Sequence, residues 1–130
     1  MLDLLRMACY EGGRLRNVRE ALLAPDSLQI AAIELQFDAL TITISAAGDD
    51  DTVLITSEPF SDNLRPSSGA LWRLCIGKPL QWAWLMTNQQ GYTDGVRLEF
   101  NDPDDLESVL VDLVVAASSV HAYQARPIEA

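Results

Sequence analysis

The class of the fold is decided by the stretch Ile33-Glu34-Leu35-Gln36-Phe37-Asp38-Ala39-Leu40-Thr41-Ile42-Thr43-Ile44-Ser45. Apolar and polar side chains alternate over residues 33–38 and again over residues 40–45. Successive side chains of a β-strand point to opposite faces, so this period of two predicts two strands with one apolar face each. Because only a short break separates the two runs, we expect an antiparallel hairpin.

The same kind of pattern predicts further strands after this hairpin. Beyond a turn at residues 47–50, the run Thr52–Thr56 predicts a third strand. A second hairpin is expected from residues 81–87 and 96–100, joined by a turn at residues 88–92. Successive strands with short turns favour a meander, in which one face of the sheet packs on the core and the other faces water.

Two segments have the marks of short helices. The first ten residues place leucines among polar residues, and the paired glycines at 12 and 13 end the segment because they cost much backbone entropy inside any element. Residues 71–75 space apolar side chains three and four apart, with Ser68 positioned to cap a helix. The segment Arg14–Leu23 has an irregular pattern that fits either a strand or a short helix.

The C-terminal third carries two conflicting signals. Asp102-Pro103-Asp104-Asp105 is typical of a helix start, because proline suits the first helical position and acidic side chains favour the positive end of the helix dipole. Against a helix, Val109–Ala117 is rich in β-branched valine, which favours a strand. We expect a single acidic turn, then a strand buried on both faces, and a last strand over Val120–Arg126.

Together these elements predict one α+β domain spanning residues 1–130. We expect an antiparallel sheet of about six strands in meander-like order, with one or two short helices at its side or end. A chain of 130 residues with 48% apolar and 22% charged residues is typical of one globular domain. We find no internal repeat and no low-complexity tract in it.

The charge balance points toward a basic partner and away from nucleic acid. The sequence has 19 acidic and 9 basic residues, which give a net charge of −10. Such a chain repels phosphate backbones and anionic membrane surfaces, so nucleic-acid and membrane partners are not expected. A basic protein would instead be steered toward it. The acidity also keeps a protein soluble, whether or not it serves binding.

Cysteine usage and the start of the chain indicate the cytoplasm. Cys9 and Cys75 lie far apart in apolar stretches, and Met1-Leu2-Asp3-Leu4-Leu5-Arg6 lacks the features of an export signal. Two free thiols are therefore expected rather than a disulfide. No apolar run approaches the roughly 20 residues that a membrane span needs.

No residue pattern points to catalysis, a metal or a cofactor. His121 is the single histidine, and no serine or cysteine lies in a motif that would expose a nucleophile. Aspartates gather at residues 49–51 and 102–105, but turns and helix starts attract aspartate for backbone reasons, and calcium-loop spacing is missing. We expect no catalytic residue, no metal and no cofactor. A non-enzymatic protein is favoured, although two carboxylates meeting in space would leave glycosidase-type chemistry open.

The segment Trp82–Gly95 differs from the rest of the chain. It brings two tryptophans, a tyrosine, several amide side chains and two glycines together, and both glycines suit positive φ angles in a hairpin loop. An aspartate before the second glycine favours a turn there. Aromatic side chains are enriched at protein interfaces, so this segment supplies the candidate binding residues. They are Trp82, Trp84, Gln89, Gln90, Tyr92 and Asp94.

The alternative for this segment is purely structural. In that interpretation, which we favour for the tryptophans, Trp82 and Trp84 belong to the core and the loop is only a well-made turn. For the tip of the loop, with Gln89, Gln90 and Tyr92, the structural and the functional interpretations stay equally open.

The spacing Trp82-x-Trp84-x-x-x-Asn88-x-x-Gly91-Tyr92-x-Asp94-Gly95-x-x-Leu98-x-Phe100 resembles the central signature of a small bacterial family of uncharacterised domains. The stretches Asp51-Thr52 and Ala116-Ala117-Ser118 are also similar to that family. The resemblance covers most of the chain after the first hairpin. It implies a small α+β domain with an antiparallel sheet, and it implies no activity, ligand or catalytic residue.

These observations leave three functions open. The leading one is a non-enzymatic interaction protein, for example an immunity-like or antitoxin-like partner that masks a basic protein through its acidic surface. The second is a small-molecule-binding domain or minor enzyme with a pocket lined by Trp82, Trp84 and Tyr92. The third is a homodimer whose sheet edge or tryptophan face forms its own interface.

Overall fold

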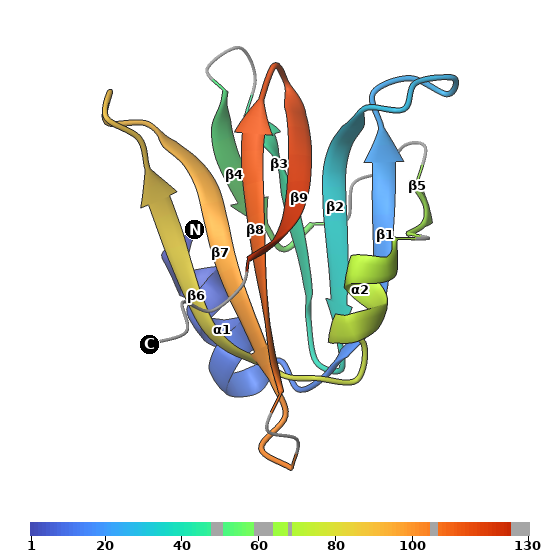
Figure 1. Ribbon diagram of the computed structural model, residues 1–130, viewed down its shortest axis with the longest axis vertical. Helices are drawn as coiled ribbons and strands as arrows, with labels where there is room; N and C mark the ends of the chain where they lie inside the picture. The colour runs from blue at the N-terminus through green and yellow to red at the C-terminus, as the bar shows by residue number, and fades with distance from the viewer. Residues whose placement is uncertain (48–50, 59–63, 68, 105–106, 126–130) are drawn as a thin grey trace.

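The computed structural model describes residues 1–47, 51–58, 64–67, 69–104 and 107–125. Within these ranges the chain forms two helices and nine strands (Figure 1). In chain order they are α1 (Leu2–Glu11), β1 (Leu15–Leu22), β2 (Ile30–Phe37), β3 (Thr41–Ala47), β4 (Thr52–Thr56), β5 (Leu64–Pro66), α2 (Ala70–Cys75), β6 (Leu80–Thr87), β7 (Thr93–Asn101), β8 (Ser108–Ala116) and β9 (Ser119–Ala125).

The strands form two antiparallel sheets, with the orders β4-β3-β2-β1-β5 and β6-β7-β8-β9. Both sheets are meanders, apart from β5, which returns to the outer side of β1. The predicted α+β class is confirmed. The expectation of one sheet of about six strands is wrong, because the chain divides its strands between two sheets. Two sheets that are each apolar on one face bury those faces best by packing against each other.

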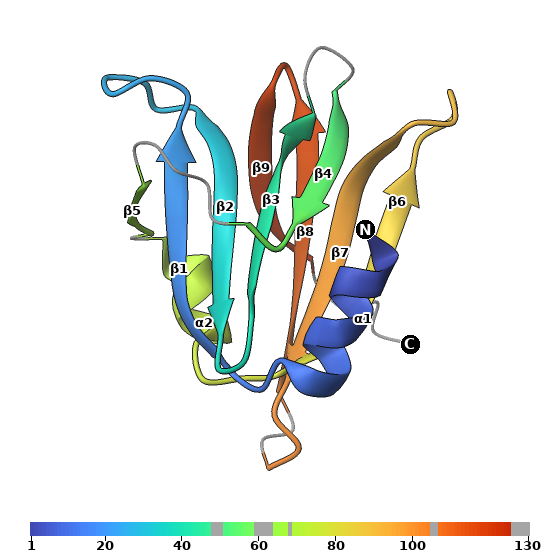
Figure 2. The ribbon, with the colours of Figure 1, turned by 180° about the vertical axis from the view of Figure 1, so that it is seen from behind.

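The two sheets pack face to face, with β2 against β9 and β4 against β7 (Figures 1 and 2). Their inner faces supply most of the core, in which Ile33, Leu35, Ile42, Leu98 and Leu113 are fully buried. Removing such apolar surface from water contributes about 25 cal/mol per Å² and is the main term that stabilises the fold.

The stretch that predicts the first hairpin forms β2 and β3 as expected. Ile33 lies opposite Ile44 and Leu35 lies opposite Ile42, and all four side chains are buried on the inner face. The amide of Phe37 donates to the carbonyl of Leu40 and closes the turn. The alternation in the sequence therefore sets both the strands and their register.

The C-terminal strand is confirmed in β8, but it is buried on one face only. Val109, Val111, Leu113 and Val115 are buried, whereas the residues between them are partly exposed. The expected burial on both faces is wrong, because within the described residues no layer covers the outer face of this sheet.

The turn between β8 and β9 is tied to the other sheet. Ala117 and Ser118 both adopt positive φ angles, which a two-residue hairpin turn of this kind requires. The amide of Ser118 donates to the carboxylate of Asp51, just before β4, at 3.0 Å. Residues 51 and 116–118, which suggested the family resemblance, therefore meet at one end of the sandwich.

A helix followed by a four-stranded meander occurs twice in this fold, first as α1 with β1–β4 and then as α2 with β6–β9. β1 and β6 are both eight residues long, and their pairing with the next strand shifts after the first residue and before the last in each. Arg14 and Pro79, which precede these strands, form an antiparallel bridge with each other. Contact between equivalent positions indicates an approximate twofold relation between the halves. The architecture is thus repeated, although we found no repeat in the sequence.

Each helix covers a part of the opposite half that the other sheet leaves open. α1 packs against β6 and buries Leu5 and Ala8 (Figure 2). α2 lies over one end of β1 and β2, on the side that faces β8 and β9, and buries Trp72 and Cys75 (Figure 1). The helices therefore complete the core where the sheets do not overlap.

Local signals around the helices are partly confirmed. α1 ends before the predicted glycines, and Gly13 has a φ of +78° with the Asp38 carboxylate so close that a Cβ would lie 2.6 Å from an oxygen. α2 begins at Ala70 with Gly69 before it, and the predicted cap Ser68 lies outside the described residues. Parts of the predicted turns at 47–50 and 102–105, and residue 126 of the last strand, also lie outside them. No helix in the described part of the chain has the length and apolar character to cross a membrane.

Candidate functional site

β6 changes face near its start. The pairing of β6 with β7 shifts between Leu80 and Trp82, which marks a β-bulge. A bulge moves the later side chains of a strand to the opposite face. Leu80 is therefore buried, whereas Trp82 and Trp84 point away from the core and are 53% and 45% exposed. The interpretation that places these tryptophans in the core is wrong for this reason.

Trp84 begins a row of side chains that crosses the outer face of the second sheet. The register places Trp84 beside Arg97, Arg97 beside Asp112, and Asp112 beside Tyr123. Tyr123 is 57% exposed, and its ring stacks on that of His121 with the centroids 6.5 Å apart. We call this surface the aromatic face. Its members are Trp82, Trp84, Met86, Arg97, Glu99, Leu110, Asp112, His121 and Tyr123.

An ion pair stands at the centre of the aromatic face. Arg97 donates from Nε to one carboxylate oxygen of Asp112 at 2.7 Å and from Nη2 to the other at 2.9 Å. This hydrogen bonding, together with the charge of Asp112, raises the pKa of Arg97, so the guanidinium stays charged. A partly exposed pair adds little to stability. Its two-point geometry holds both side chains in fixed orientations, which suits recognition.

A shallow groove of about 360 Å³ opens beside Trp84 on the aromatic face. It is lined by Trp84, Met86, Arg97, Glu99 and Leu110, which come from β6, β7 and β8. The lining combines an aromatic ring, a flexible thioether, the guanidinium of Arg97 and the carboxylate of Glu99.

The first sheet has polar side chains where the second has tryptophans. Counted from the first residue of each strand, Trp82 and Trp84 in β6 correspond to Asn17 and Arg19 in β1. Arg19 donates to Glu34 across the sheet at 2.6 and 2.9 Å, and Asn17 donates to Gln36 at 3.1 Å. The fold is therefore built in one half without any large apolar side chain at these two positions.

The turn between β6 and β7 is organised by Asn88. Its side-chain oxygen accepts hydrogen bonds from the amides of Gln90 at 2.9 Å and Tyr92 at 3.2 Å. Its side-chain nitrogen donates to the carboxylate of Asp94 at 3.2 Å. Gly91 has a φ of +88°, as its place in a tight turn predicts. Local folding thus accounts for Asn88, Gly91 and Asp94.

The predicted site residues fall into two groups. Trp82 and Trp84 lie together on the aromatic face, whereas Gln89, Gln90 and Tyr92 lie at the exposed end of the β6–β7 hairpin. The predicted turn at Asp94 is wrong, because Asp94 already belongs to β7. The residue after it also lies in β7, without the positive φ we expected, and passes under the side chain of Met86.

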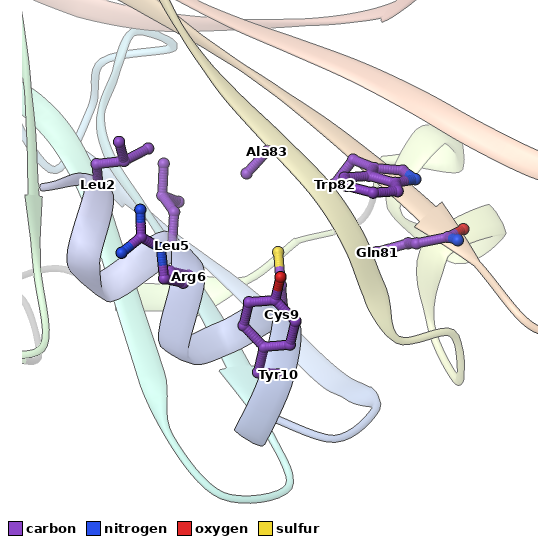
Figure 3. A pocket seen from close by; sticks show the side chains of 8 residues that line it. All are labelled: Leu2, Leu5, Arg6, Cys9, Tyr10, Gln81, Trp82 and Ala83. Carbon is purple, nitrogen blue, oxygen red and sulfur yellow. The ribbon is translucent and has the colours of Figure 1, made fainter.

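A second hollow lies between α1 and β6 (Figure 3). One pocket of about 190 Å³ is lined by Leu2, Leu5, Arg6, Cys9, Tyr10, Gln81, Trp82 and Ala83. A neighbouring pocket of about 350 Å³ shares four of these residues and adds Pro79, Leu80, Asn101 and Pro103. Burial raises the pKa of the Cys9 thiol, so it stays protonated at neutral pH and is a poor nucleophile. The hollow thus offers apolar contacts rather than reactive groups.

Two acidic side chains around Arg14 have structural partners. Asp102 accepts a bond from Arg14 at 2.6 Å, and this bond is the main reason why the pKa of Asp102 is lowered. Asp38 holds Arg16 and the backbone of Arg14, which lower its pKa in the same way. No group of three histidine, cysteine or carboxylate side chains gathers for a metal among the residues that the structure describes. Cys9 and Cys75 are free thiols.

Sequence reasoning missed the members of the aromatic face that come from β8 and β9. Leu110, Asp112 and Tyr123 are far from Trp84 in the sequence and meet it only through strand pairing. The alternation of buried valine with other residues in β8 was the available signal, because it marks every second residue as outward-facing.

The amino-acid sequence matches the family of unknown function DUF6334 over residues 2–129. No curated protein and no solved structure matches the chain. The match covers nearly the whole sequence. It confirms the expectation that the chain belongs to an uncharacterised family. The chain belongs to the family of unknown function DUF6334.

Proposed function

We propose that this domain is a non-enzymatic protein-binding module of the bacterial cytoplasm that docks a basic partner protein on its aromatic face. One observation carries the proposal. Trp82 and Trp84 are about half exposed on β6, although the equivalent positions of β1 hold Asn17 and Arg19. Exposing two such rings to water brings no benefit to the fold, so a role in binding is the physical reason for them.

The composition of the aromatic face suits a protein interface. Tryptophan, tyrosine and arginine supply most of the binding energy in protein interfaces, and truncating one such residue at the centre costs about 2 kcal/mol or more. Trp84, Arg97 and Tyr123 form one row across the sheet, with the Arg97–Asp112 pair between the two rings. A partner that covers this row would bury aromatic surface around a polar centre.

Charge selects the kind of partner. The chain carries a net charge of −10, and Glu99 and Asp112 place two carboxylates on the aromatic face against the single guanidinium of Arg97. A basic side chain in the groove beside Trp84 would gain both cation–π and ionic attraction. In its most specific form the proposal describes an immunity-like or antitoxin-like protein, which masks a basic toxin or enzyme by covering its working surface.

Capture followed by titration tests the proposal. Tagged wild-type protein and a Trp84→Ala variant are used in parallel to capture proteins from the native host, and a basic protein held by the first bait only is then purified. We expect its affinity to fall as salt concentration rises, because the attraction is partly ionic. Binding that is equal for both baits, or indifferent to salt, would contradict the proposal.

The hollow between α1 and β6 supports a second candidate, the binding of a small apolar molecule. Its two pockets are contiguous, share Cys9, Tyr10, Gln81 and Trp82, and have few charged groups. Pockets of roughly 300 Å³ and more hold small ligands in other proteins. A thermal-shift screen with small aromatic and aliphatic compounds tests it. Stabilisation that is lost in Ala83→Trp, which fills the hollow, and kept in Tyr123→Ala would support this candidate.

A further inference from the structure

The outer edge of β6 has no strand paired to it in the described part of the chain. The equivalent edge of β1 in the first half is covered by β5, which pairs Pro66 with Arg19 and Leu64 with Ala21. β1 and β6 have the same length and the same two register shifts. The pairing of β5 with β1 is therefore an example of how the outer edge of β6 could accept an antiparallel strand. The uncovered part of β6 corresponds to Trp84–Met86.

The β6 edge also lacks the usual protection against pairing. Exposed edge strands are normally kept short or carry charged residues or proline. β5, which ends the first sheet, is three residues long and contains Arg65 and Pro66. β6 is eight residues long and contains neither a charged residue nor a proline. Within the described residues, the backbone donors and acceptors along the outer edge of β6 therefore have no paired strand and no charged or proline residue to keep a further strand away.

We propose that β6 pairs with β6 of a second copy of this chain. The four-stranded sheets of the two copies then form one continuous sheet. A second copy fits because the edge is uncharged, so two chains of net charge −10 meet there without opposed like charges. Leu85 of β6 corresponds to the central residue of β1 in the β1–β5 pair. In an antiparallel twofold pairing centred on Leu85, Trp84 lies beside Met86 of the second copy. Contacts between methionine sulfur and aromatic rings are favourable.

The surroundings of β6 supply further area for this interface. Tyr10 on α1 is 81% exposed and, like Trp82, lines the hollow between α1 and β6 (Figure 3). In the proposed register, the hairpin turn with Gln89 and Gln90 of one copy lies along the hollow of the other. If Tyr10, Trp82 and Trp84 each lose about 100 Å² of exposed surface, the two copies together bury on the order of 600 Å². That is about half of the roughly 1,200 Å² that the smallest stable interfaces bury, before the paired strands are counted.

Sedimentation equilibrium of the full chain tests this pairing, which does not depend on the proposed partner protein. We expect wild type to be a dimer. Trp84→Lys and Met86→Lys, each of which replaces one partner of the proposed Trp84–Met86 contact by a charge at the strand edge, should weaken dimerisation by about a hundredfold or more. Tyr123→Lys is the matched control, because it places the same charge on the same face at the far edge strand β9, and it should stay dimeric.

Three outcomes overturn the inference. A wild-type chain that sediments as a monomer at every concentration has no such interface. Equal dissociation by Trp84→Lys and Tyr123→Lys would place the interface on the aromatic face rather than at the strand edge. Cross-linking gives a test that does not rely on the lysine variants. In a Cys9→Ser chain, Leu85→Cys should form an inter-chain disulfide under mild oxidation, and Tyr123→Cys should not. A dimer that cross-links only through residue 123 contradicts the pairing.

Discussion

The rings of Phe37 and Phe100 stack with their centroids 6.4 Å apart and their planes inclined by 13°. Each phenylalanine ends the inner face of the second strand in its half, Phe37 in β2 and Phe100 in β7. The pair therefore joins equivalent positions of the two halves, next to the bridge between Arg14 and Pro79. The two meanders are held together at one end by contacts between matching residues.

The Phe100→Ala variant tests how much the contact between Phe37 and Phe100 contributes to the free energy of unfolding. Phe100 is fully buried, so its loss should lower the free energy of unfolding by about 3–5 kcal/mol, from lost burial and the cavity left behind. Urea denaturation gives the value. Tyr123→Ala is the control on the exposed face and should change stability by less than about 1 kcal/mol. A small effect of Phe100→Ala would mean that the halves do not depend on this contact.

The sequence predicts some strands of the two halves and not others. Regular alternation reveals β2 and β3, and the valines of β8 outweigh the helix-start signal before them. β1 is ambiguous because its bulge after Leu15 breaks the period of two. β5 is too short to leave a pattern. The repeat leaves one trace, Ile33-x-Leu35-x-Phe37 against Val96-x-Leu98-x-Phe100, in which only the inner-face residues correspond because only they meet the same surroundings.

Tryptophan fluorescence checks the placement of the aromatic face. Trp72 is 4% exposed, whereas Trp82 and Trp84 are about half exposed. In a Trp72→Phe variant, the remaining emission should be quenched strongly by acrylamide in the dissociated chain and less in the dimer. In a Trp82→Phe, Trp84→Phe double variant, the emission of Trp72 should resist quenching. Strong protection of Trp82 and Trp84 in the monomer would restore the core interpretation.

The Arg14–Asp102 ion pair predicts a specific dependence of stability on pH. Hydrogen bonding to Arg14 lowers the pKa of Asp102 in the folded protein, so the pair stabilises the fold at pH values above the unfolded pKa of about 3.9. This contribution is lost as pH falls through the lower, folded pKa. Thermal melts of wild type and Asp102→Asn should therefore differ at neutral pH and converge in acid.

The control for this experiment is Asp26→Asn, which removes an exposed turn carboxylate and the same unit of charge. If Asp26→Asn gave the same pH-dependent difference from wild type as Asp102→Asn, net charge rather than the ion pair would be responsible.

The two thiols should differ in reactivity. Burial raises the pKa of Cys75 to about 12, and it raises the pKa of the half-buried Cys9 as well. At neutral pH both thiols are protonated, and only the thiolate reacts quickly. Ellman's reagent should therefore label Cys9 slowly and Cys75 only when the chain unfolds, so that urea releases the second equivalent. Rapid labelling of Cys75 in the native protein would contradict its burial.

The candidate site was half predictable. The richness of Trp82–Gly95 in aromatic and amide residues marks the hairpin as unusual. The bulge between Leu80 and Trp82 decides whether the tryptophans face the core or the solvent. It could not be predicted from the sequence, because none of residues 80–82 is a glycine or a proline. The rest of the aromatic face is assembled by pairing between strands that are distant in the chain, which local patterns do not encode.

The measurement that tests the central claim most directly is calorimetric titration of the captured basic partner with wild type, Trp84→Ala and Leu54→Ala. Leu54 is a large apolar side chain on β4 of the other sheet, with an exposed fraction close to that of Trp84. We predict that Trp84→Ala weakens binding by about 30-fold or more, as expected for a central aromatic contact worth about 2 kcal/mol. Leu54→Ala should bind as wild type does. Unchanged affinity in Trp84→Ala, or an equal loss in Leu54→Ala, would contradict the aromatic face as the binding surface.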